Sequence, residues 1–567
     1  MKQFWIFTIC CIAFGNSEGQ DMYLRFPEKL SIGAGSSSHQ IEGAWNVSDK
    51  GENIWDKWTH DNSEAIADGC NADIACNSYY KYKEDVQRIK SIGVSPQYRD
   101  HKAIKYIFTT FNFQLDFYRF SISWSRILPT GFTNVINEEG LQYYKNLTAE
   151  LVANGIEPIV TMYHFDHPQI IEDMGGWTNE LIVDWFVSYA RVLFEALGDS
   201  VKIWTTINEP STFCTYGYNY STIQGAPGKD LLGIGLYLCG HNALKAHAKT
   251  YRMYDEEFRA TQGGQIGIVI HCSAYVAENP SDTVFVETAY QFSCGWFAHP
   301  IYFGDYPDIM KERIAMISKW QGWPRSRLPE FSEKWISIVK GTTDYFGLNH
   351  YSSAFVSPDP DEKLGIYNSD LGLIVSVNSR WPNSTASSLS VYPPGFGYLL
   401  RKIKDEYNNP PVRIMENGHA DSGELNDYAR ISYHYGYLRE LLIAMKRDGC
   451  NILSYSIWSM IDSFEWNNGY TQKFGIFSVD FDDPDRTRRT KLSTYWWTRV
   501  LAARKLQRVP TDTVIKYQNL MAQMSLIAPL RTSTLNLFNN EKKLRCSTLN
   551  VFISRHFKTV YVSIKLT

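Results

Sequence analysis

The chain has 567 residues, enough for one large domain or several small ones, and its composition is that of an ordinary globular protein. Its formal net charge of −4 gives no reason to expect nucleic acid or an anionic membrane as a partner. Aromatic residues make up 15% of the chain, but they fill cores as well as stacking on sugars, so this fraction does not decide the function.

The N-terminus predicts export. A short apolar run between Phe4 and Phe14 follows Lys2 and precedes small and polar residues, an order typical of a secretory signal peptide. The run is too short to span a bilayer. We therefore expect residues 1–19 to be removed and the mature protein to be secreted. Four sequons of exported glycoproteins support this prediction, at Asn46, Asn146, Asn219 and Asn383.

The cysteines indicate no metal site. Two of the ten lie in the leader, and the other eight lack the CxxC spacing of metal ligands. Cys70 and Cys76 are close enough in sequence to close a short disulfide loop. Most of the remaining six stand in apolar contexts, so we expect buried free thiols.

Short β-rich runs alternate with amphipathic segments over residues 20–507, which predicts an α/β fold: a single-domain (β/α)8 barrel. Eight strands are predicted, at Leu30–Gly35, Phe117–Ser121, Pro158–Tyr163, Ile203–Asn208, Ile266–His271, Tyr345–Asn349, Val412–Glu416 and Ile452–Trp458. Apolar residues at helical spacing predict helices at Ser78–Ile92, Thr178–Leu197, Leu236–Phe258 and Asp427–Arg447.

Two stretches interrupt this pattern. Removing residues 94–114 leaves a clean helix–loop–strand passage, and the stretch begins Val-Ser and ends Phe-Gln, which the intron-boundary codons GTA-AGT and TTT-CAG can encode. We hypothesise a short retained intron; a real surface insertion is the alternative. Residues 508–567 form a basic tail rich in Ser, Thr, Asn and Lys, which indicates a disordered extension or another error of gene prediction.

Polar residues stand at the carboxyl ends of the predicted strands, where barrel enzymes carry their catalytic groups. Two are carboxylates, Glu209 in Thr-Ile-Asn-Glu-Pro and Glu416 in Ile-Met-Glu-Asn-Gly. Glycoside hydrolysis needs one carboxylic acid to protonate the leaving oxygen and a second carboxylate across the bond. The other strand ends carry Arg119, His164, Asn208, Asn349 and Trp458.

These motifs resemble glycoside hydrolase family 1, the β-glucosidase and myrosinase family, from about Phe26 to Leu506. The matching segments are Gln40–Trp45, Tyr118–Arg126, Asn208–Pro210, Glu416–Gly418, Ser463–Asn467 and Phe474–Ile476. The resemblance implies a retaining β-glycosidase that hydrolyses β-D-glucosides through a covalent glycosyl-enzyme. It also implies that no cofactor or metal is needed, since two carboxylates suffice.

The resemblance implies a role for each matching residue. Glu209 would be the acid/base and Glu416 the nucleophile, with Arg119 and Tyr351 flanking Glu416 and Asn349 nearby. The cation of Arg119 would favour ionised Glu416, whose charge would keep Glu209 protonated until the glycosyl-enzyme forms. The sugar would contact Gln40, His164, Asn208, Glu465 and Trp466, over a floor formed by Trp458. The aglycone would contact Tyr218, Trp381 and Phe474.

The substrate is less tightly specified. A carboxylate at Glu465 repels phosphate, which favours an unphosphorylated glycone. A thioglucosidase acting on glucosinolates is the alternative activity, because some animal thioglucosidases keep both carboxylates. A non-catalytic carbohydrate-binding protein is a third alternative, against which the presence of both Glu209 and Glu416 argues. The expected partner is a small glycoside, and the sequence leaves a monomer or a homodimer open.

Overall fold

The computed structural model describes residues 24–92, 114–219, 225–279, 282–359, 370–386, 389–509, 546–553 and 560–566. The chain divides into two compact units, Met1–Val509 and Pro510–Thr567. In the second unit, β14 (Cys546–Ile553) and β15 (Val560–Leu566) form a two-stranded antiparallel sheet. The predicted leader and all but the last residue of the predicted insertion lie outside the described residues.

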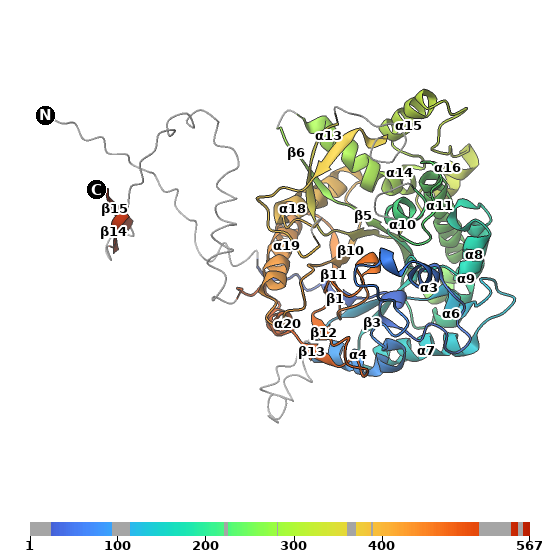
Figure 1. The fold of residues 1–567 in the computed structure, drawn as a ribbon, viewed down its shortest axis with the longest axis horizontal. Helices are drawn as coiled ribbons and strands as arrows, with labels where there is room; N and C mark the ends of the chain where they lie inside the picture. The colour runs from blue at the N-terminus through green and yellow to red at the C-terminus, as the bar shows by residue number, and fades with distance from the viewer. Residues whose placement is uncertain are drawn as a thin grey trace. The chain divides into compact units, whose positions relative to one another are not determined.

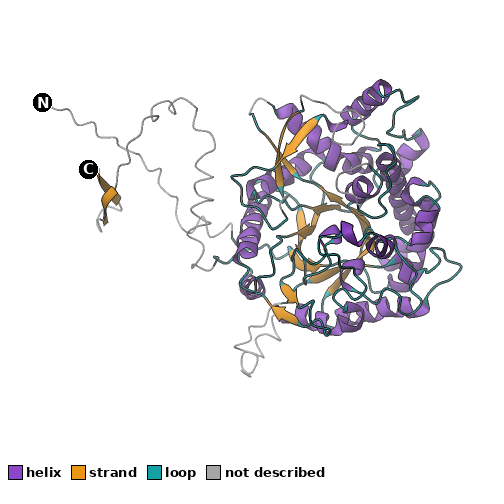
Figure 2. Cartoon of the chain, viewed as in Figure 1, coloured by secondary structure: helices purple, strands orange, loops and turns teal. Residues whose placement is uncertain are grey.

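Eight parallel strands of the first unit close into a barrel surrounded by helices (Figures 1 and 2). Their order around the barrel is β1, β11, β10, β7, β5, β4, β3, β2, and β2 pairs again with β1. This confirms the predicted (β/α)8 fold, and each predicted strand is present with bounds that differ by at most one residue. The strands are β1 Ser31–Gly35, β2 Phe117–Ser121, β3 Glu157–Tyr163, β4 Ile203–Asn208, β5 Gln265–His271, β7 Phe346–Asn349, β10 Val412–Asn417 and β11 Ile452–Trp458.

The strands could be predicted from the sequence because both of their faces are buried, one inside the barrel and one under helices, so that each strand is a nearly continuous apolar run. Inside the barrel, Phe117, Ile159, Ile203, Val269, Tyr345 and Met415 form one apolar cluster. Side chains alternate along a strand, so Arg119 shares the inner side of β2 with Phe117, two residues earlier. Arg119 therefore begins a polar layer above the apolar one.

The four predicted helices are present as α4 (Ser78–Ser91), α9 (Ile182–Leu197), α11 (Gly235–Met253) and α19 (Tyr428–Lys446). Two bounds differ. Gly176–Thr178 form a separate 3-10 turn, η3, and Tyr254–Phe258 form a π-helical turn, η4, after α11. The other helices of the outer ring and of the C-terminus are α7 Glu138–Ala153, α14 Trp296–Phe303, α15 Asp308–Trp320, α16 Glu333–Val339, α18 Pro393–Glu406 and α20 Leu492–Ala503.

Shorter helices and two small sheets lie in the connections between the barrel strands and the outer helices. The described short helices are α2 Ser38–Ile41, α3 Ile54–Asp61, η1 Ser63–Ala65, α6 Trp124–Ile127, α8 Gln169–Asp173, α10 Pro210–Gly217, α12 Arg259–Gln262, α13 Thr283–Tyr290, η5 Gln291–Gly295 and η6 Trp466–Asn468. A three-stranded sheet contains β6 Ala274–Ala277, β8 Ser353–Pro358 and β9 Leu373–Ser376. Strands β12 (Phe477–Val479) and β13 (Arg488–Thr490) pair antiparallel.

The cysteine predictions were partly wrong. Cys214–Cys239 and Cys272–Cys294 are disulfides, with Cα–Cα distances of 5.6 and 4.8 Å. An apolar sequence context is shared by a buried thiol and a buried disulfide, so only the tertiary distance distinguishes them. The predicted Cys70–Cys76 disulfide is absent, because Cys70 is exposed while Cys76 is buried and its Sγ donates to the Asp462 carbonyl at 3.0 Å. Cys450 is buried and free, as expected.

The Cys214–Cys239 disulfide joins α10 to α11 and closes a loop between cysteines 25 residues apart. Replacing both cysteines by alanine should lower the free energy of unfolding by about 3 kcal/mol, because the cross-link restricts the unfolded chain. Urea denaturation of the purified protein measures the change. Cys70→Ser, at an exposed thiol, is the control and should shift stability by less than about 0.5 kcal/mol. Equal stabilities of the double variant and this control would contradict the prediction.

Candidate active site

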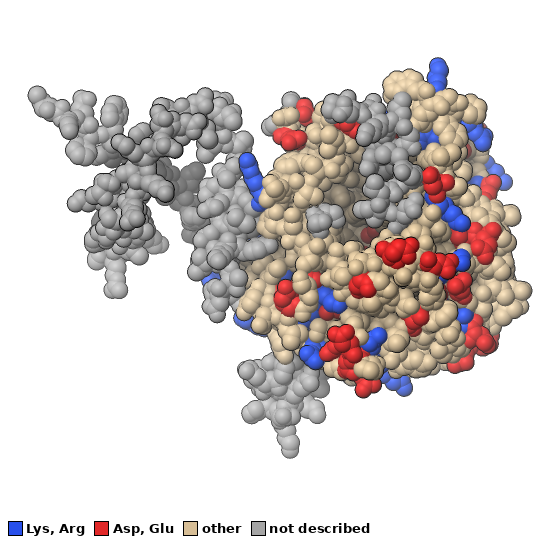
Figure 3. Space-filling model, viewed as in Figure 1, with Lys and Arg blue, Asp and Glu red and all other residues tan. Residues whose placement is uncertain are grey.

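A cavity of about 470 Å³ lies at the carboxyl ends of the barrel strands. Both candidate catalytic carboxylates, Glu209 from the end of β4 and Glu416 from β10, line it. The other predicted residues in its lining are His164, Asn208, Tyr351, Trp458, Glu465, Trp466 and Phe474. Gln40, Arg119 and Asn349 are fully buried one layer behind. The face seen in Figure 3 carries interspersed acidic and basic side chains rather than a broad field of one charge.

Glu416 is held by two donors. The Arg119 guanidinium bonds to Oε1, and Tyr351 Oη donates to Oε2 at 2.6 Å. Only 3% of Glu416 is exposed, and this burial raises the pKa of its carboxyl to about 7, against the lowering effect of Arg119 and with a further rise from the charge of Glu209. We expected the cation to dominate, but desolvation of the carboxylate outweighs it.

Glu209 has a different environment. It follows β4 with a left-handed φ of 42°, and α10 begins at the next residue, Pro210. Asn349 Nδ2 donates to its Oε1 at 2.7 Å, and Thr212 Oγ1 donates to its Oε2 at 2.8 Å. Neither partner is a cation, whereas Glu416 has one. The two carboxylates are therefore distinct in their surroundings, as an acid and a nucleophile must be.

Arg119 organises the layer beneath the cavity. Besides Glu416, its guanidinium donates to Asn208 Oδ1 at 2.6 Å and to Thr161 Oγ1 at 3.1 Å. Asn208 Nδ2 in turn lies 3.2 Å from His164 Nε2, which accepts because an amide NH2 can only donate. Burial and the charge of Arg119 lower the pKa of His164 well below its usual value. His164 is thus neutral, with its proton on Nδ1, which has no protein partner among the described residues and is available to a ligand.

The predicted sugar-binding end combines amides, carboxylates and indoles. Gln40 accepts from Ser37 Oγ at 2.7 Å and donates to the Phe464 carbonyl at 2.8 Å. Ser463 Oγ donates to Glu465 Oε1 at 2.8 Å. Burial, with a contribution from the charge of Glu416, raises the pKa of Glu465 to about 8. A carboxyl that stays protonated at neutral pH can both donate to and accept from a hydroxyl.

The Glu-Asn-Gly motif has a steric reason for its glycine. A Cβ on Gly418 would lie 1.9 Å from the carbonyl oxygen of Trp458. Only glycine lets the segment after Glu416 pass this close to the end of β11, where the Trp458 ring lines the cavity. The indole ring of Trp458 is stacked beside the imidazole of His164, with centroids 5.8 Å apart and planes at 16°.

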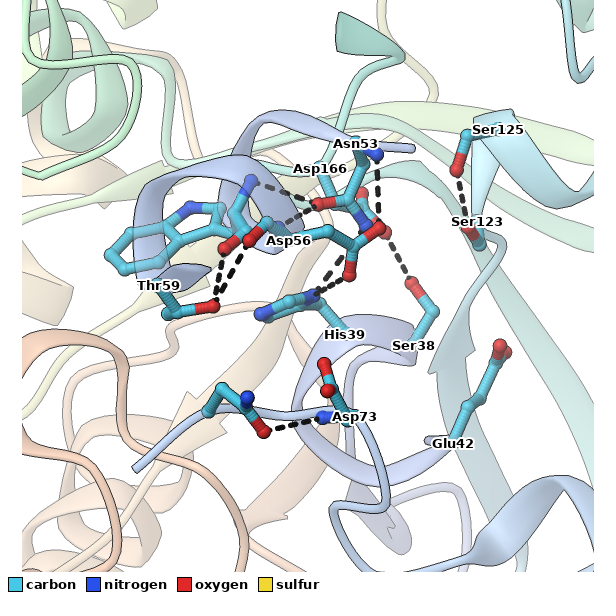
Figure 4. Close-up of polar contacts among 12 residues, drawn as sticks. Ser38, His39, Glu42, Asn53, Asp56, Thr59, Asp73, Ser123, Ser125 and Asp166 are labelled. Atoms are coloured by element: carbon cyan, nitrogen blue, oxygen red, sulfur yellow. Dashed lines mark hydrogen bonds and ion pairs between the residues drawn. The ribbon is translucent and has the colours of Figure 1, made fainter. Parts of the chain in front are cut away.

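A buried polar network supports the loops behind the cavity, and Figure 4 shows its members side by side. Ser38 Oγ donates to Asp166 Oδ2 at 2.7 Å, which ties α2, the short helix that carries Gln40, to the loop after β3. Asn53 caps α3 by accepting from the backbone N–H groups of Trp55 and Asp56 at 2.8 and 2.9 Å. Trp55 lines the cavity and packs on Trp466 with ring centroids 4.8 Å apart, so this cap positions a cavity wall.

Two of the three predicted aglycone residues are misplaced. Phe474 lines the cavity, but Tyr218 is 1% exposed and bonds to Glu172, and Trp381 stacks on Tyr392 at 4.2 Å; neither contributes to the lining. Phe165, Thr212, Phe213, Tyr216 and Leu389 also line the cavity, and sequence reasoning assigned no role to the last four. Three of these share one face of α10, and their i, i+1, i+4 spacing after Glu209 is the signal that could have identified them.

The sequons differ in accessibility. Asn46, Asn146 and Asn383 are exposed. Asn219 is only 3% exposed, so a glycan cannot be attached there in this conformation, and its assignment as a glycosylation site is corrected. Whether the asparagine of a sequon is buried depends on the tertiary structure, and the three-residue motif does not predict it.

The described part of the chain holds no group of three or more His, Cys, Asp or Glu side chains placed to bind a metal ion. Nor does any helix within the described ranges have the length and apolar character needed to cross a membrane.

Comparison with known proteins agrees with this geometry. The family model "Glycosyl hydrolase family 1" matches residues 22–108 and 98–506. The chain is 44% identical over 489 residues to Myrosinase 1 of Brevicoryne brassicae, covering 85% of this chain and 100% of the relative. It is 37% identical over 493 residues to cytosolic beta-glucosidase of Cavia porcellus, covering 86% of this chain and 100% of the relative.

A solved structure is also similar. A rice beta-glucosidase mutant in a covalent complex with Glc superposes with a TM-score of 0.76 at 33% identity, covering 84% of this chain and 99% of that one. With a family match that spans nearly the whole barrel and relatives of this identity and coverage, the chain belongs to glycosyl hydrolase family 1 and is a retaining β-glycosidase.

Proposed function

We propose that the preferred substrates of this enzyme are β-D-glucosides with an O-linked aglycone, hydrolysed by double displacement with Glu416 as nucleophile and Glu209 as acid/base. The observation that carries the proposal is the asymmetric pair of carboxylates in one cavity: Glu416 has a cation and a phenol as donors, and Glu209 has an amide and a hydroxyl.

In the first step, ionised Glu416 attacks the anomeric carbon while Glu209 gives its proton to the leaving oxygen. Arg119 and Tyr351 hold the attacking carboxylate in one orientation, which lowers the cost of reaching the transition state. Asn208, fixed between Arg119 and His164, is placed to hold a sugar hydroxyl whose hydrogen bond strengthens as positive charge develops.

In the second step, the glycosyl ester on Glu416 carries no charge. Glu209 has lost both its proton and the repulsion of its neighbour, so it can act as a base toward water that attacks the same carbon. The two inversions retain the β configuration. No further group is required, because both proton transfers use Glu209.

Several observations support glucose as the glycone. Glu465 offers a buried carboxyl to sugar hydroxyls, and the indoles of Trp458 and Trp466 border the same space. The rice relative described above was captured with Glc covalently bound. Cytosolic beta-glucosidase is a second relative of matching length.

Thioglucosidase activity is the second candidate. It is favoured by the similarity to Myrosinase 1 of Brevicoryne brassicae, at 44% identity over the whole of that protein. Cleavage of a thioglycoside needs less proton donation than cleavage of an O-glycoside, so an intact Glu209 is compatible with both activities. Since both carboxylates are present and held in the cavity, a carbohydrate-binding protein without activity is the weakest reading.

Export and processing are part of the proposal. The predicted leader at residues 1–19 is the reason to propose secretion, and two disulfides support it because disulfides persist in oxidising compartments.

The two stretches of the family match overlap at residues 98–108, inside the 94–114 segment, which supports an insertion relative to the family.

Glu416→Ala should abolish hydrolysis, because no carboxylate remains to form the glycosyl-enzyme, and added azide should yield the α-glucosyl azide. Glu209→Ala should slow poorly activated glucosides by about 10²–10⁴-fold, the contribution of general acid catalysis, and azide should yield the β-glucosyl azide. Product configuration is read by NMR. Azides of the opposite configurations would show that the two roles are reversed.

The acidic limb of kcat/KM should lie near pH 7, since Glu416 must be ionised to attack and burial raises its pKa to about 7. Tyr351→Phe removes a hydrogen bond that lowers this pKa, so the pKa rises and the limb should move to higher pH by roughly one unit. Thr212→Val is the control, because it loses a bond to Glu209 and leaves Glu416 untouched. A limb that stays in place in Tyr351→Phe would assign the titration to another group.

The substrate proposal is tested by expressing the chain with and without residues 94–114 and assaying an aryl β-glucoside, an aryl β-galactoside and a glucosinolate, with Glu416→Ala as the blank. We expect at least the shortened form to be active and the glucoside to have the highest kcat/KM. A highest value for the glucosinolate would make the enzyme a thioglucosidase. Folded, inert protein in both forms would overturn the enzyme assignment.

A further inference from the structure

We propose that His167, Glu172 and Tyr218 form a buried strut that positions the aglycone wall of the active site and thereby affects which aglycones the enzyme accepts. The inference rests on the proposed function, because it concerns the leaving-group side of the same cavity. None of the three residues lines the cavity, so they are positioning residues rather than catalytic ones.

The strut is a continuous chain of hydrogen bonds. Tyr163 Oη lies 3.0 Å from His167 Nδ1, and His167 Nε2 lies 3.1 Å from Glu172 Oε2. Tyr218 Oη donates to the same Glu172 oxygen and accepts from the backbone N–H of Trp177 at 3.2 Å. Since a carboxylate accepts, Nε2 of the imidazole carries the proton and Nδ1 accepts from the Tyr163 hydroxyl. Every bond in the chain then has one donor and one acceptor.

Burial makes these bonds hard to replace. His167 is 0% exposed, Tyr218 1% and Glu172 4%, so water cannot take over a lost partner. Burial and the charge of Glu172 raise the pKa of Tyr218 well above its usual value, so the phenol remains a donor. A Cβ on Gly176 would lie 1.9 Å from Glu172 Oε2 and 2.5 Å from Tyr218 Oη. The backbone at this glycine therefore packs directly against the hydrogen-bonded oxygens of the strut.

The strut connects the two segments that supply Phe165, Thr212, Phe213 and Tyr216 to the cavity lining. His167 follows Phe165 by two residues in the loop after β3, and Glu172 lies on α8 in the same connection. Tyr218 directly follows α10, the helix that presents Thr212, Phe213 and Tyr216 to the cavity. Aromatic rings meet at the same junction: Phe213 packs on Tyr163, Phe165 and Trp177, with centroids 5.1, 5.8 and 5.6 Å away.

Loss of one bond in the strut should therefore let the end of α10 move relative to α8. The rings of Phe213 and Tyr216 would move with it, and a small displacement of a binding wall is enough to change catalysis. Most of the glycone side depends on other elements, because Trp458 is on β11 and Glu465 and Trp466 follow it. His164 begins the connection after β3, but its contact with Asn208 of β4 holds it at the strand end. The effect should thus depend on the aglycone and not on the sugar.

The test compares two substrates that share the glucosyl group. 4-Nitrophenyl β-D-glucoside has an aromatic aglycone and β-D-glucosyl fluoride has none, and both leaving groups depart with little help from an acid. For Tyr218→Phe and for His167→Leu, kcat/KM on the nitrophenyl glucoside should fall about tenfold, the size of a lost contact in an apolar pocket. On the fluoride kcat/KM should stay near the wild-type value.

Tyr189→Phe is the matched control. It also removes a buried phenol that donates at 2.9 Å, here to the Met162 carbonyl, and it leaves both loops alone. This variant should keep the wild-type ratio of the two substrates. Equal losses on both substrates, or an unchanged ratio in Tyr218→Phe, would overturn the strut, and if His167→Leu fails to fold, Tyr218→Phe decides. Wild-type protein inert on both substrates would overturn the proposed function instead.

Discussion

The buried guanidinium of Arg119 is the constraint on which the active site depends. A fully buried cation is stable only if its hydrogen bonds are satisfied and a counter-charge is close. Arg119 meets this condition with Glu416, Asn208 and Thr161, which come from three other strands. The requirement to pair one charge therefore brings the ends of β2, β3, β4 and β10 to a common point, and that point is the base of the catalytic cavity.

This arrangement divides the molecule into two kinds of parts. The chemistry belongs to strand ends, which the closed barrel holds rigidly at fixed separations. The walls belong to the loops and short helices that follow the strands, and these need supports of their own. The Cys214–Cys239 disulfide behind α10, the cap of α3 by Asn53 and the strut through Glu172 are three such supports, each placed one layer outside the cavity.

The buried carboxyls show how far burial competes with charge pairing. Burial raises the pKa of Glu416 even though Arg119 is bonded to it, and Glu465 and Asp166 show the same direction. A neighbouring cation alone does not predict the protonation of a buried carboxyl, because burial in surroundings of low polarity also disfavours the ionised form.

Much of the fold and of the site could be predicted from the sequence. Strands buried on both faces are continuous apolar runs, so their bounds were predicted to within one residue, and the catalytic motifs stand at the ends of those runs. The errors have a common cause. Tyr218 and Trp381 are aromatic residues on loops, as aglycone residues are, but the direction of a loop side chain is decided by its tertiary neighbours.

The sequence by itself determined the barrel, the two carboxylates and their strand positions, because these depend on local periodicity and on short motifs. Only the tertiary structure decided which cysteines pair, that Asn219 is buried, that Thr212 bonds to the acid/base, and which rings form the aglycone wall. Each of these depends on a distance between residues that are far apart in the chain or on exposure to water. Neither quantity is encoded in a local pattern; both arise only when the barrel closes.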